Sequence, residues 1–232
     1  MMRSRFQHGL DELRERLLEM GGMAEAAVEL ASDSYRKRDA RLAQAVFERE
    51  EMINASERAI DELVVDLLAM QQPMATDLRF VLAVLKINSD LERVGDLAVN
   101  IAQRSLDLTE QPEVDVPVDI PRMTAAVATM VRRALEAFLS AKADVAQAVL
   151  EMDSIVDRMK DEAFINLVGQ MTSNPDRVRT YLDVLLITRS LERIADHATN
   201  IAEDVIFWVS GADVRHNVRF STEPDADAPR SH

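Results

Sequence analysis

Two copies of one segment organise this chain: Leu91-Glu92-Arg93-Val94-Gly95-Asp96-Leu97-Ala98-Val99-Asn100-Ile101-Ala102 and Leu191-Glu192-Arg193-Ile194-Ala195-Asp196-His197-Ala198-Thr199-Asn200-Ile201-Ala202. Every position of the second copy lies 100 residues after its counterpart in the first. The shared Glu-x-x-x-Asp-x-x-x-Asn spacing predicts a helix on which the three polar side chains form one row. Two carboxylates in such a row repel by roughly 0.2–0.5 kcal/mol. Because both copies carry this cost, the pattern indicates a cation nearby.

The composition predicts an all-helical protein. Of 232 residues, 47% are hydrophobic but only 4% are aromatic, and the chain contains just 6 Gly and 7 Pro. Long runs of good helix formers with few turn residues are typical of the all-α class. The formal net charge of −14 excludes a general nucleic-acid binder, which needs a basic face. The absence of cysteine excludes disulfides and thiolate metal sites.

The N-terminal segment is polar and amphipathic, without the apolar stretch of a secretion signal. No apolar run approaches the roughly 20 residues that span a bilayer. We therefore expect a soluble protein in the cytoplasm.

Apolar periodicity and the turn signals predict six long helices in two repeated halves of three helices each. Residues 1–108 form the first bundle, an acidic proline-containing linker spans 109–121, and residues 122–210 form the second bundle. We expect the polar end, 211–232, to be disordered. The predicted helices run over about 6–35, 39–70, 73–108, 121–139 and 141–171, with the sixth reaching about 208.

Each predicted helix has an apolar face. On the third and sixth helices, the acidic row borders an apolar row that includes Leu91 and Leu191. The acidic side chains should therefore face a neighbouring helix. On the second helix, we expect the buried positions to be Leu42, Val46, Met52, Ile53, Ile60, Leu63, Val64 and Leu67.

The preceding helices carry polar pairs at matched places. Glu50 and Asn54 lie on the second helix, and Asp153 and Asp157 lie on the fifth. An antiparallel neighbour presenting such a pair would supply enough oxygen atoms to hold a hard cation. The candidate metal ligands are Glu50, Asn54, Glu92, Asp96, Asn100, Asp153, Asp157, Glu192, Asp196 and Asn200.

Two interpretations of these rows remain open from the residues alone. Acidic rows are often solvated or paired with arginine, and Arg93 and Arg193 adjoin them. Asn100 and Asn200 suit hydrogen bonds between helices equally well. His197 points about 100° away from Asp196 on the helix, which favours a surface or packing residue over a ligand.

Motifs for enzymatic chemistry are missing. The sequence contains no phosphate-binding loop, no His-Glu-x-x-His and no Gly-x-Ser-x-Gly. It also lacks the Glu-x-x-His pairs of di-iron bundles. We therefore expect a protein that is not an enzyme, in which the role of any bound metal need not be catalytic.

The chain resembles the PhoU family of phosphate-transport regulators over about residues 6–208. The resemblance is carried by Met20-Gly21-Gly22-Met23, by Pro73-x-Ala75-x-Asp77-Leu78-Arg79, and by Leu-Glu-Arg-(Val/Ile)-(Gly/Ala)-Asp with its downstream Asn in both halves. It implies two tandem three-helix bundles, a homodimer, and a cytoplasmic protein that attends the phosphate ABC transporter.

The resemblance also implies function and ligands. Family members repress the phosphate-starvation response by linking the transporter's ATPase subunit to a sensor histidine kinase. They carry multinuclear metal clusters on Glu/Asp-x-x-x-Asp motifs, which match Glu92/Asp96, Glu192/Asp196 and Asp153/Asp157 here. The second helix departs from the motif because Asn54 replaces a carboxylate, which weakens the charge of the first site.

Three functions follow as hypotheses. The first is a non-enzymatic signalling adaptor, the second a metal-storage or catalytic metal-binding bundle, and the third a structural scaffold with ion-paired acidic rows. The missing enzyme motifs favour the adaptor. Oxygen ligands favour iron, manganese, magnesium or calcium over a thiolate-type zinc site, and the family expectation is an iron cluster or Mn, Mg or Zn ions.

Overall fold

The computed structural model describes residues 2–70, 73–213 and 218–219. The predicted all-α fold with two three-helix halves is confirmed. A 3₁₀ turn, η1, covers Pro175–Arg177 and leads directly into the last helix. The helices are α1 (Met2–Lys37), α2 (Ala40–Met70), α3 (Ala75–Thr109), α4 (Ile120–Ser140), α5 (Ala143–Ser173) and α6 (Val178–Ser210).

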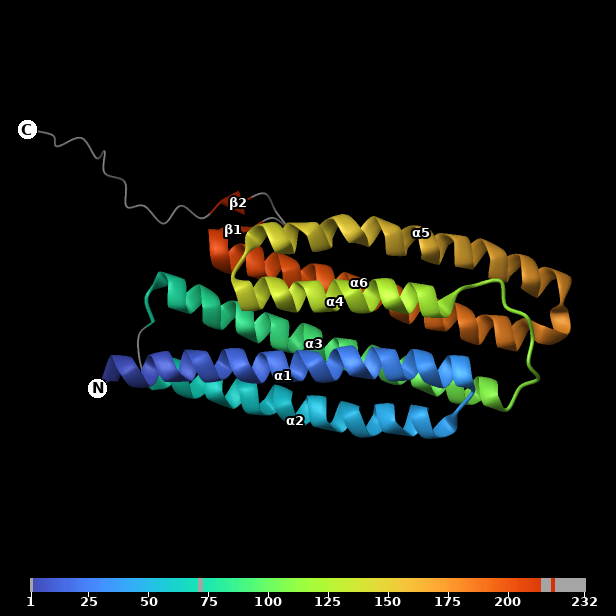
Figure 1. Ribbon diagram of the computed structural model, residues 1–232, viewed down its shortest axis with the longest axis horizontal. Coiled ribbons are helices and arrows are strands. Elements are labelled where there is room, and N and C mark those ends of the chain that lie inside the picture. The colour runs from blue at the N-terminus through green and yellow to red at the C-terminus, as the bar shows by residue number, and fades with distance from the viewer. Residues whose placement is uncertain (1, 71–72, 214–217, 220–232) are drawn as a thin grey trace, which may run out of the picture.

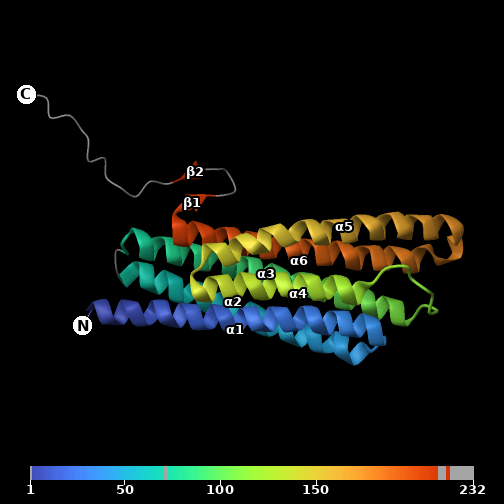
Figure 2. The same cartoon turned by 45° about the horizontal axis from the view of Figure 1, so that its top comes forward.

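The two bundles lie side by side along their length (Figure 1). Within each bundle, consecutive helices run antiparallel and pack against one another. Between the bundles, α3 packs on α6 and α1 packs on α4, an arrangement that the turned view in Figure 2 also shows. The repeated segments therefore lie on the two central helices of the molecule.

One continuous hydrophobic core fills both bundles. Leu91 on α3 and Leu191 on α6 are fully buried members of the same cluster of contacting residues. Three of the few aromatic residues also join the halves, since Phe80 packs on both Phe138 and Trp208 with ring centroids 5.9 and 5.0 Å apart. Although the linker separates the halves in sequence, the two bundles stabilise each other by sharing apolar surface.

The apolar rows beside the acidic residues are buried as predicted on both central helices. On α2 the expectation for Met52 is wrong, since Met52 is 57% exposed while Ile53 is fully buried, and Leu42 and Leu63 are only partly buried. Successive residues on a helix are about 100° apart, and Ile53 takes the position that faces the core. Gly21 and Gly22 lie within α1 without interrupting it.

Local caps explain the ends of the helices. Asp39 caps α2, because its Oδ1 accepts a hydrogen bond from the Arg41 backbone N–H at 2.9 Å. Asp119 Oδ1 likewise accepts from the Arg122 N–H at 3.0 Å and starts α4. Asn174 precedes η1 but its side chain does not cap it, because that side chain donates back to Gln170 instead.

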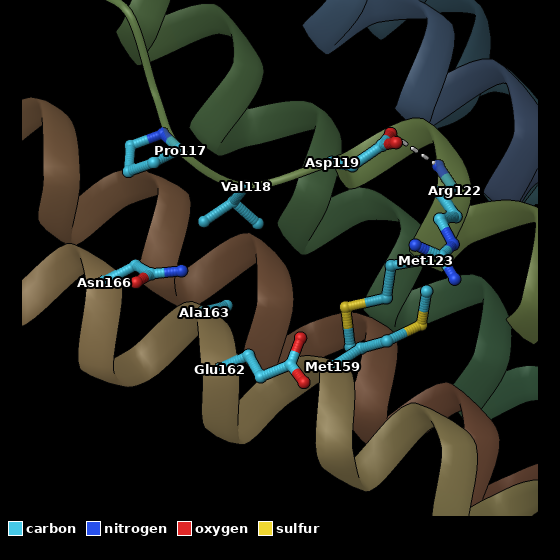
Figure 3. Close-up of a pocket in the computed structure, with 9 residues that line it drawn as sticks. All are labelled: Pro117, Val118, Asp119, Arg122, Met123, Met159, Glu162, Ala163 and Asn166. Carbon is cyan, nitrogen blue, oxygen red and sulfur yellow. Dashed lines mark hydrogen bonds between the residues drawn. The ribbon is translucent and has the colours of Figure 1, made fainter.

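The linker between the halves is held in place. Arg38 Nη2 donates hydrogen bonds to the carbonyl oxygens of Leu108 and Gln111, and Gln111 Nε2 donates to Asp183 Oδ2 on α6 at 2.9 Å. Its end, Pro117 to Asp119, covers a small pocket of about 100 Å³ against Met123 and α5 (Figure 3). None of the candidate metal ligands lines this pocket.

The chain after α6 turns back on itself. Ala212–Asp213 (β1) pairs antiparallel with Val218–Arg219 (β2). Most of the segment predicted to be disordered, 214–217 and 220–232, lies outside the described residues.

Candidate functional site

The first acidic cluster lies between α2 and α3. Because these helices run antiparallel, the row with Glu50, Asn54 and Glu57 faces the row with Glu92 and Asp96. Asn54 Nδ2 donates a hydrogen bond to Glu50 Oε1. The helices thus bring Glu92 close to Glu50 and add Glu57 to the predicted set.

Two oxygen atoms of this cluster are buried without a hydrogen-bond partner: Glu92 Oε2 and Asn54 Oδ1. The Arg93 guanidinium lies 3.3 Å from Glu92 Oε2 but does not reach hydrogen-bond geometry with it. Instead, Arg93 Nη1 donates to Asp96 Oδ2 at 3.0 Å. A buried acceptor without a donor costs about 1–3 kcal/mol, so the cluster has an unmet demand for positive charge.

The raised pKa of Glu92 also indicates an excess of negative charge in the first cluster. Burial is the largest cause that raises the pKa of Glu92, and the negative charges of Asp96, Glu57 and Glu50 raise it further. Arg93 opposes this shift only in part. The carboxylates therefore repel one another across the helix interface.

The second acidic cluster lies between α5 and α6, where Asp153 and Asp157 face Glu192 and Asp196. Burial raises the pKa of Asp153, and the charges of Asp157 and Glu192 add to it. Burial likewise raises the pKa of Asp196, followed by the charges of Glu192, Asp153 and Asp157. All four carboxylates predicted for this half are thus close enough to repel.

The second cluster contains a cation of its own. Lys160 Nζ lies 3.5 Å from Glu192 Oε1 and 3.3 Å from Asp161 Oδ1. The hydrogen bond to Asp161 is the largest cause that raises the pKa of Lys160, and the charges of Glu192 and Asp157 contribute as well. The lysine therefore neutralises one end of the cluster.

The two asparagines of the repeated motif differ. Asn100 is exposed on α3. Asn200 is half-buried, and its Nδ2 donates to Asp90 Oδ1 on α3 at 3.3 Å, which fits a hydrogen bond between helices. His197 also reaches Asp90 and is a packing residue at the interface of the halves, as its position on the helix predicts.

The carboxylates of each cluster are close but not gathered around one point. Across residues 2–70, 73–213 and 218–219, no three Asp, Glu or His side chains are arranged to hold a metal ion. A cation in either cluster would require the acidic side chains to turn toward it.

Two residues of the clusters are absent from the sequence-based set. Glu57 and Lys160 occupy matching positions, because the second and fifth helices align with an offset of 103 residues that also relates Asn54 to Asp157. The 103-residue offset is the sequence signal that could have identified both positions. A search for pairs of like residues overlooks this position, since the two halves carry opposite charges there.

Comparison with known proteins finds the same duplication of the chain. A family model described as the PhoU domain matches residues 17–105 and again 120–205. The chain is 43% identical over 212 residues to the phosphate-specific transport system accessory protein PhoU homolog of Pseudomonas putida, covering 91% of this chain and 83% of that protein. The homolog of the same name from Pseudomonas aeruginosa is 42% identical, with 91% and 88% covered.

Solved structures share the whole fold. The crystal structure of PhoU from Pseudomonas aeruginosa superposes with a TM-score of 0.86 at 40% identity, covering 89% of this chain and 100% of that one. The phosphate transport system regulatory protein PhoU from Streptococcus pneumoniae gives a TM-score of 0.83 at 27% identity, covering 90% and 99%. In the described part of our chain, no helix has the length and apolar character needed to cross a membrane.

Proposed function

This chain belongs to the PhoU family, and from that premise we propose that it is a negative regulator of phosphate uptake and phosphate-starvation signalling. It acts in the cytoplasm without catalysing a reaction. It links the ATPase subunit of the phosphate ABC transporter to a sensor histidine kinase, and it binds metal ions on its acidic clusters. It works as a homodimer.

One observation carries the role in phosphate transport. Both halves match the PhoU domain, and relatives that share most of the chain's length are accessory proteins of phosphate-specific transport. The family model matches both central helices, α3 and α6, so the similarity extends beyond the apolar periodicity that helical bundles have in common. The absence of enzyme motifs in the sequence supports a role through binding.

The first cluster suits a metal ion by its chemistry. Its donors are all oxygens, which hard cations prefer, and Glu92 Oε2 and Asn54 Oδ1 are buried acceptors without a donor. Glu50, Asn54, Glu57, Glu92 and Asp96 would hold the ion. Bound there, a metal ion supplies positive charge that ties α2 to α3. Iron, manganese and magnesium all accept such ligands.

Exposed apolar residues support the adaptor role. Leu78 and Leu82 at the start of α3 are 39% and 40% exposed, and the matched residues of α6, Val178 and Leu182, are similarly exposed. Both pairs are spaced by four residues and so form short rows on their helices. Exposed apolar rows of this kind are used for binding protein partners.

The regulatory role is tested by deleting the gene and measuring a phosphate-starvation reporter in phosphate-rich medium. We expect high reporter expression in the deletion strain and low expression after complementation with the parent gene. Complementation with an equally abundant Glu92→Ala/Asp96→Ala/Glu192→Ala/Asp196→Ala variant then separates the role of the clusters from that of the fold. Low reporter expression in the deletion strain would refute the regulatory role.

A further inference from the structure

A pocket of about 560 Å³ lies where the two bundles meet. Its walls come from the second half of α1, from α2 and from the start of α4, and α4 packs on α1 (Figure 1). Small apolar side chains, among them Ala125 and Ala128 of α4, line it together with charged and hydroxyl groups. None of the candidate metal ligands lines it, so this pocket is separate from both acidic clusters.

Arg49 on α2 is a charged side chain of this pocket that lacks a partner. Its Nε is buried and makes no hydrogen bond. Its guanidinium forms no ion pair with any residue in the described part of the chain. Because a buried donor without an acceptor is costly, Arg49 has an unmet demand for an oxygen atom with negative charge.

The other charged residues of the pocket have partners. Arg36 Nη2 donates to Asp33 Oδ1 at 2.7 Å. Glu29 Oε1 lies 3.5 Å from Arg132 Nη2 on α4. Neither carboxylate is paired with Arg49, so the positive charge of Arg49 is available to a ligand. The pocket can therefore receive an anion although the chain as a whole is acidic.

The groups around Arg49 favour an anion that also carries a proton. A guanidinium binds the oxygen atoms of carboxylates and phosphates. The Glu29 carboxylate, which is 57% exposed, is an acceptor only. It repels an anion without a proton but accepts a hydrogen bond from one that has a proton. Phosphate keeps a proton near pH 6, since the second pKa of a phosphate monoester is about 6, whereas sulfate and carboxylates do not.

We propose that this pocket binds a phosphate group, with Arg49 donating to its oxygen atoms and Glu29 accepting from its remaining proton. The inference goes beyond the function proposed above and needs neither the metal ions nor the partner proteins of that proposal. The pocket is larger than a single phosphate ion, so it has room for a larger molecule that carries the group. Because the walls belong to both bundles, the bound group would tie α1 and α2 to α4.

The test follows the Arg49 Nε–H signal in ¹H–¹⁵N NMR spectra of the full-length chain at pH 6. EDTA is present throughout, so that no metal ion can bind the phosphate. Sodium phosphate is added at constant ionic strength, with sodium sulfate and glycerol 3-phosphate in parallel titrations. The spectrum of Arg49→Gln assigns the signal, and its backbone amide signals from the pocket report any binding that remains.

Three further variants accompany the parent. Glu29→Gln removes the proposed acceptor. Ala125→Phe fills the pocket from an exposed position of α4 without changing any charge. Arg58→Gln is the matched control, because it removes an exposed arginine of α2 that does not line the pocket.

We expect phosphate to shift the Arg49 signal saturably and sulfate to bind at least about tenfold more weakly. Glu29→Gln should reduce this preference to less than about threefold. Arg49→Gln should weaken phosphate binding at least about tenfold, because a charge-assisted hydrogen bond is lost. Ala125→Phe should abolish the shift, and Arg58→Gln should bind as the parent does.

Equal affinities for phosphate and sulfate, or no saturable shift with either phosphate compound, would overturn the inference. Phosphate binding that Arg49→Gln and Ala125→Phe leave unchanged would overturn it as well. Tighter binding of glycerol 3-phosphate than of inorganic phosphate assigns the site to the phosphate group of a larger molecule, and the reverse order assigns it to the free ion. These results are independent of the reporter assay and of the metal content that test the proposed function.

Discussion

His197 Nδ1 lies 2.7 Å from Asp90 Oδ1, and this contact joins α6 of one half to α3 of the other. Both side chains are largely buried, at 18% and 15% exposure. The positions that correspond by the repeat are Leu97 and Ser190. This polar contact is therefore made on one side of the α3–α6 interface and cannot be repeated on the other by the matching residues.

Removing this contact should weaken the association of the halves. We expect His197→Leu, which copies the residue of the first repeat, and Asp90→Asn each to lower the free energy of unfolding by about 1 kcal/mol, the usual contribution of a hydrogen bond. Chemical denaturation of the parent, both single variants and the double variant gives the coupling energy. A coupling energy near zero would show that the two side chains do not stabilise each other.

The metal-free protein should lose stability as pH rises through the titration of its clusters. The pKa values of Glu92, Asp153 and Asp196 are raised in the folded state, so the native chain holds more protons than the unfolded chain above their ordinary values. Stability then falls as pH rises from those ordinary values through the raised ones.

The matching variant is Glu92→Gln/Asp153→Asn/Asp196→Asn, melted in EDTA across the same pH range. We expect it to gain most over the parent at neutral pH and least in acid. Asp33 has the opposite pH effect, since Lys37 foremost and then Arg36 lower its pKa. Because Asp33 is present in both proteins, its contribution cancels. Parallel curves for the two proteins would contradict the raised pKa values.

The adjacent glycines of α1 should respond differently to alanine. A Cβ at Gly22 meets no atom within 4 Å, whereas a Cβ at Gly21 would lie 2.6 Å from Leu135 Cδ1 on α4. Gly22→Ala should stabilise the protein by about 0.5–1 kcal/mol through helix propensity. Gly21→Ala must displace Leu135 at the interface of the halves and should be the less stable variant by thermal melting. A higher melting temperature for Gly21→Ala than for Gly22→Ala would show that α1 packs against α4 differently from this structure.

The exposed apolar side chains of Leu78 and Leu82 on α3 should be needed for regulation but not for folding. Leu78→Glu/Leu82→Glu should keep the parent's circular dichroism spectrum, because both side chains already contact solvent. It should fail to silence the phosphate-starvation reporter if this row binds a partner. Gln103→Glu, at an exposed position of the same helix, is the control and should silence it. Full silencing by the leucine double variant would exclude this row as a partner surface.

The sequence was sufficient for the fold because each helix has a continuous apolar face and clear turn residues. The duplicated Leu-Glu-Arg segment also predicted that Glu92 and Asp96 would face a neighbouring helix. Glu92 interacts with Glu50 and Glu57 of α2, whereas Asp96 accepts a hydrogen bond from Arg93 of its own helix. Periodicity along one helix could not predict how the bundles meet. The shared core and the His197–Asp90 contact depend on residues about 100 positions apart.

The charge balance of the clusters was the least predictable feature. Asn54 alone suggested that the first site was the weaker one, because it replaces a carboxylate. The structure brings Glu57 to that cluster and Lys160 to the other, so both clusters have four carboxylates and one basic side chain in ion-pair contact. Glu57 and Lys160 lie outside the Glu/Asp-x-x-x-Asp motif. Only the packing of α2 on α3 and of α5 on α6 decides that their side chains reach the clusters.

We propose that the acidic clusters of this protein bind cations, and the metal content of the purified protein is the measurement that can refute this claim. Protein purified without a metal-affinity tag is measured by elemental mass spectrometry beside the Glu92→Ala/Asp96→Ala/Glu192→Ala/Asp196→Ala variant. We predict stoichiometric metal in the parent and none in a variant that retains the helical circular dichroism spectrum. No metal in the parent, or equal metal in both proteins, would contradict the claim.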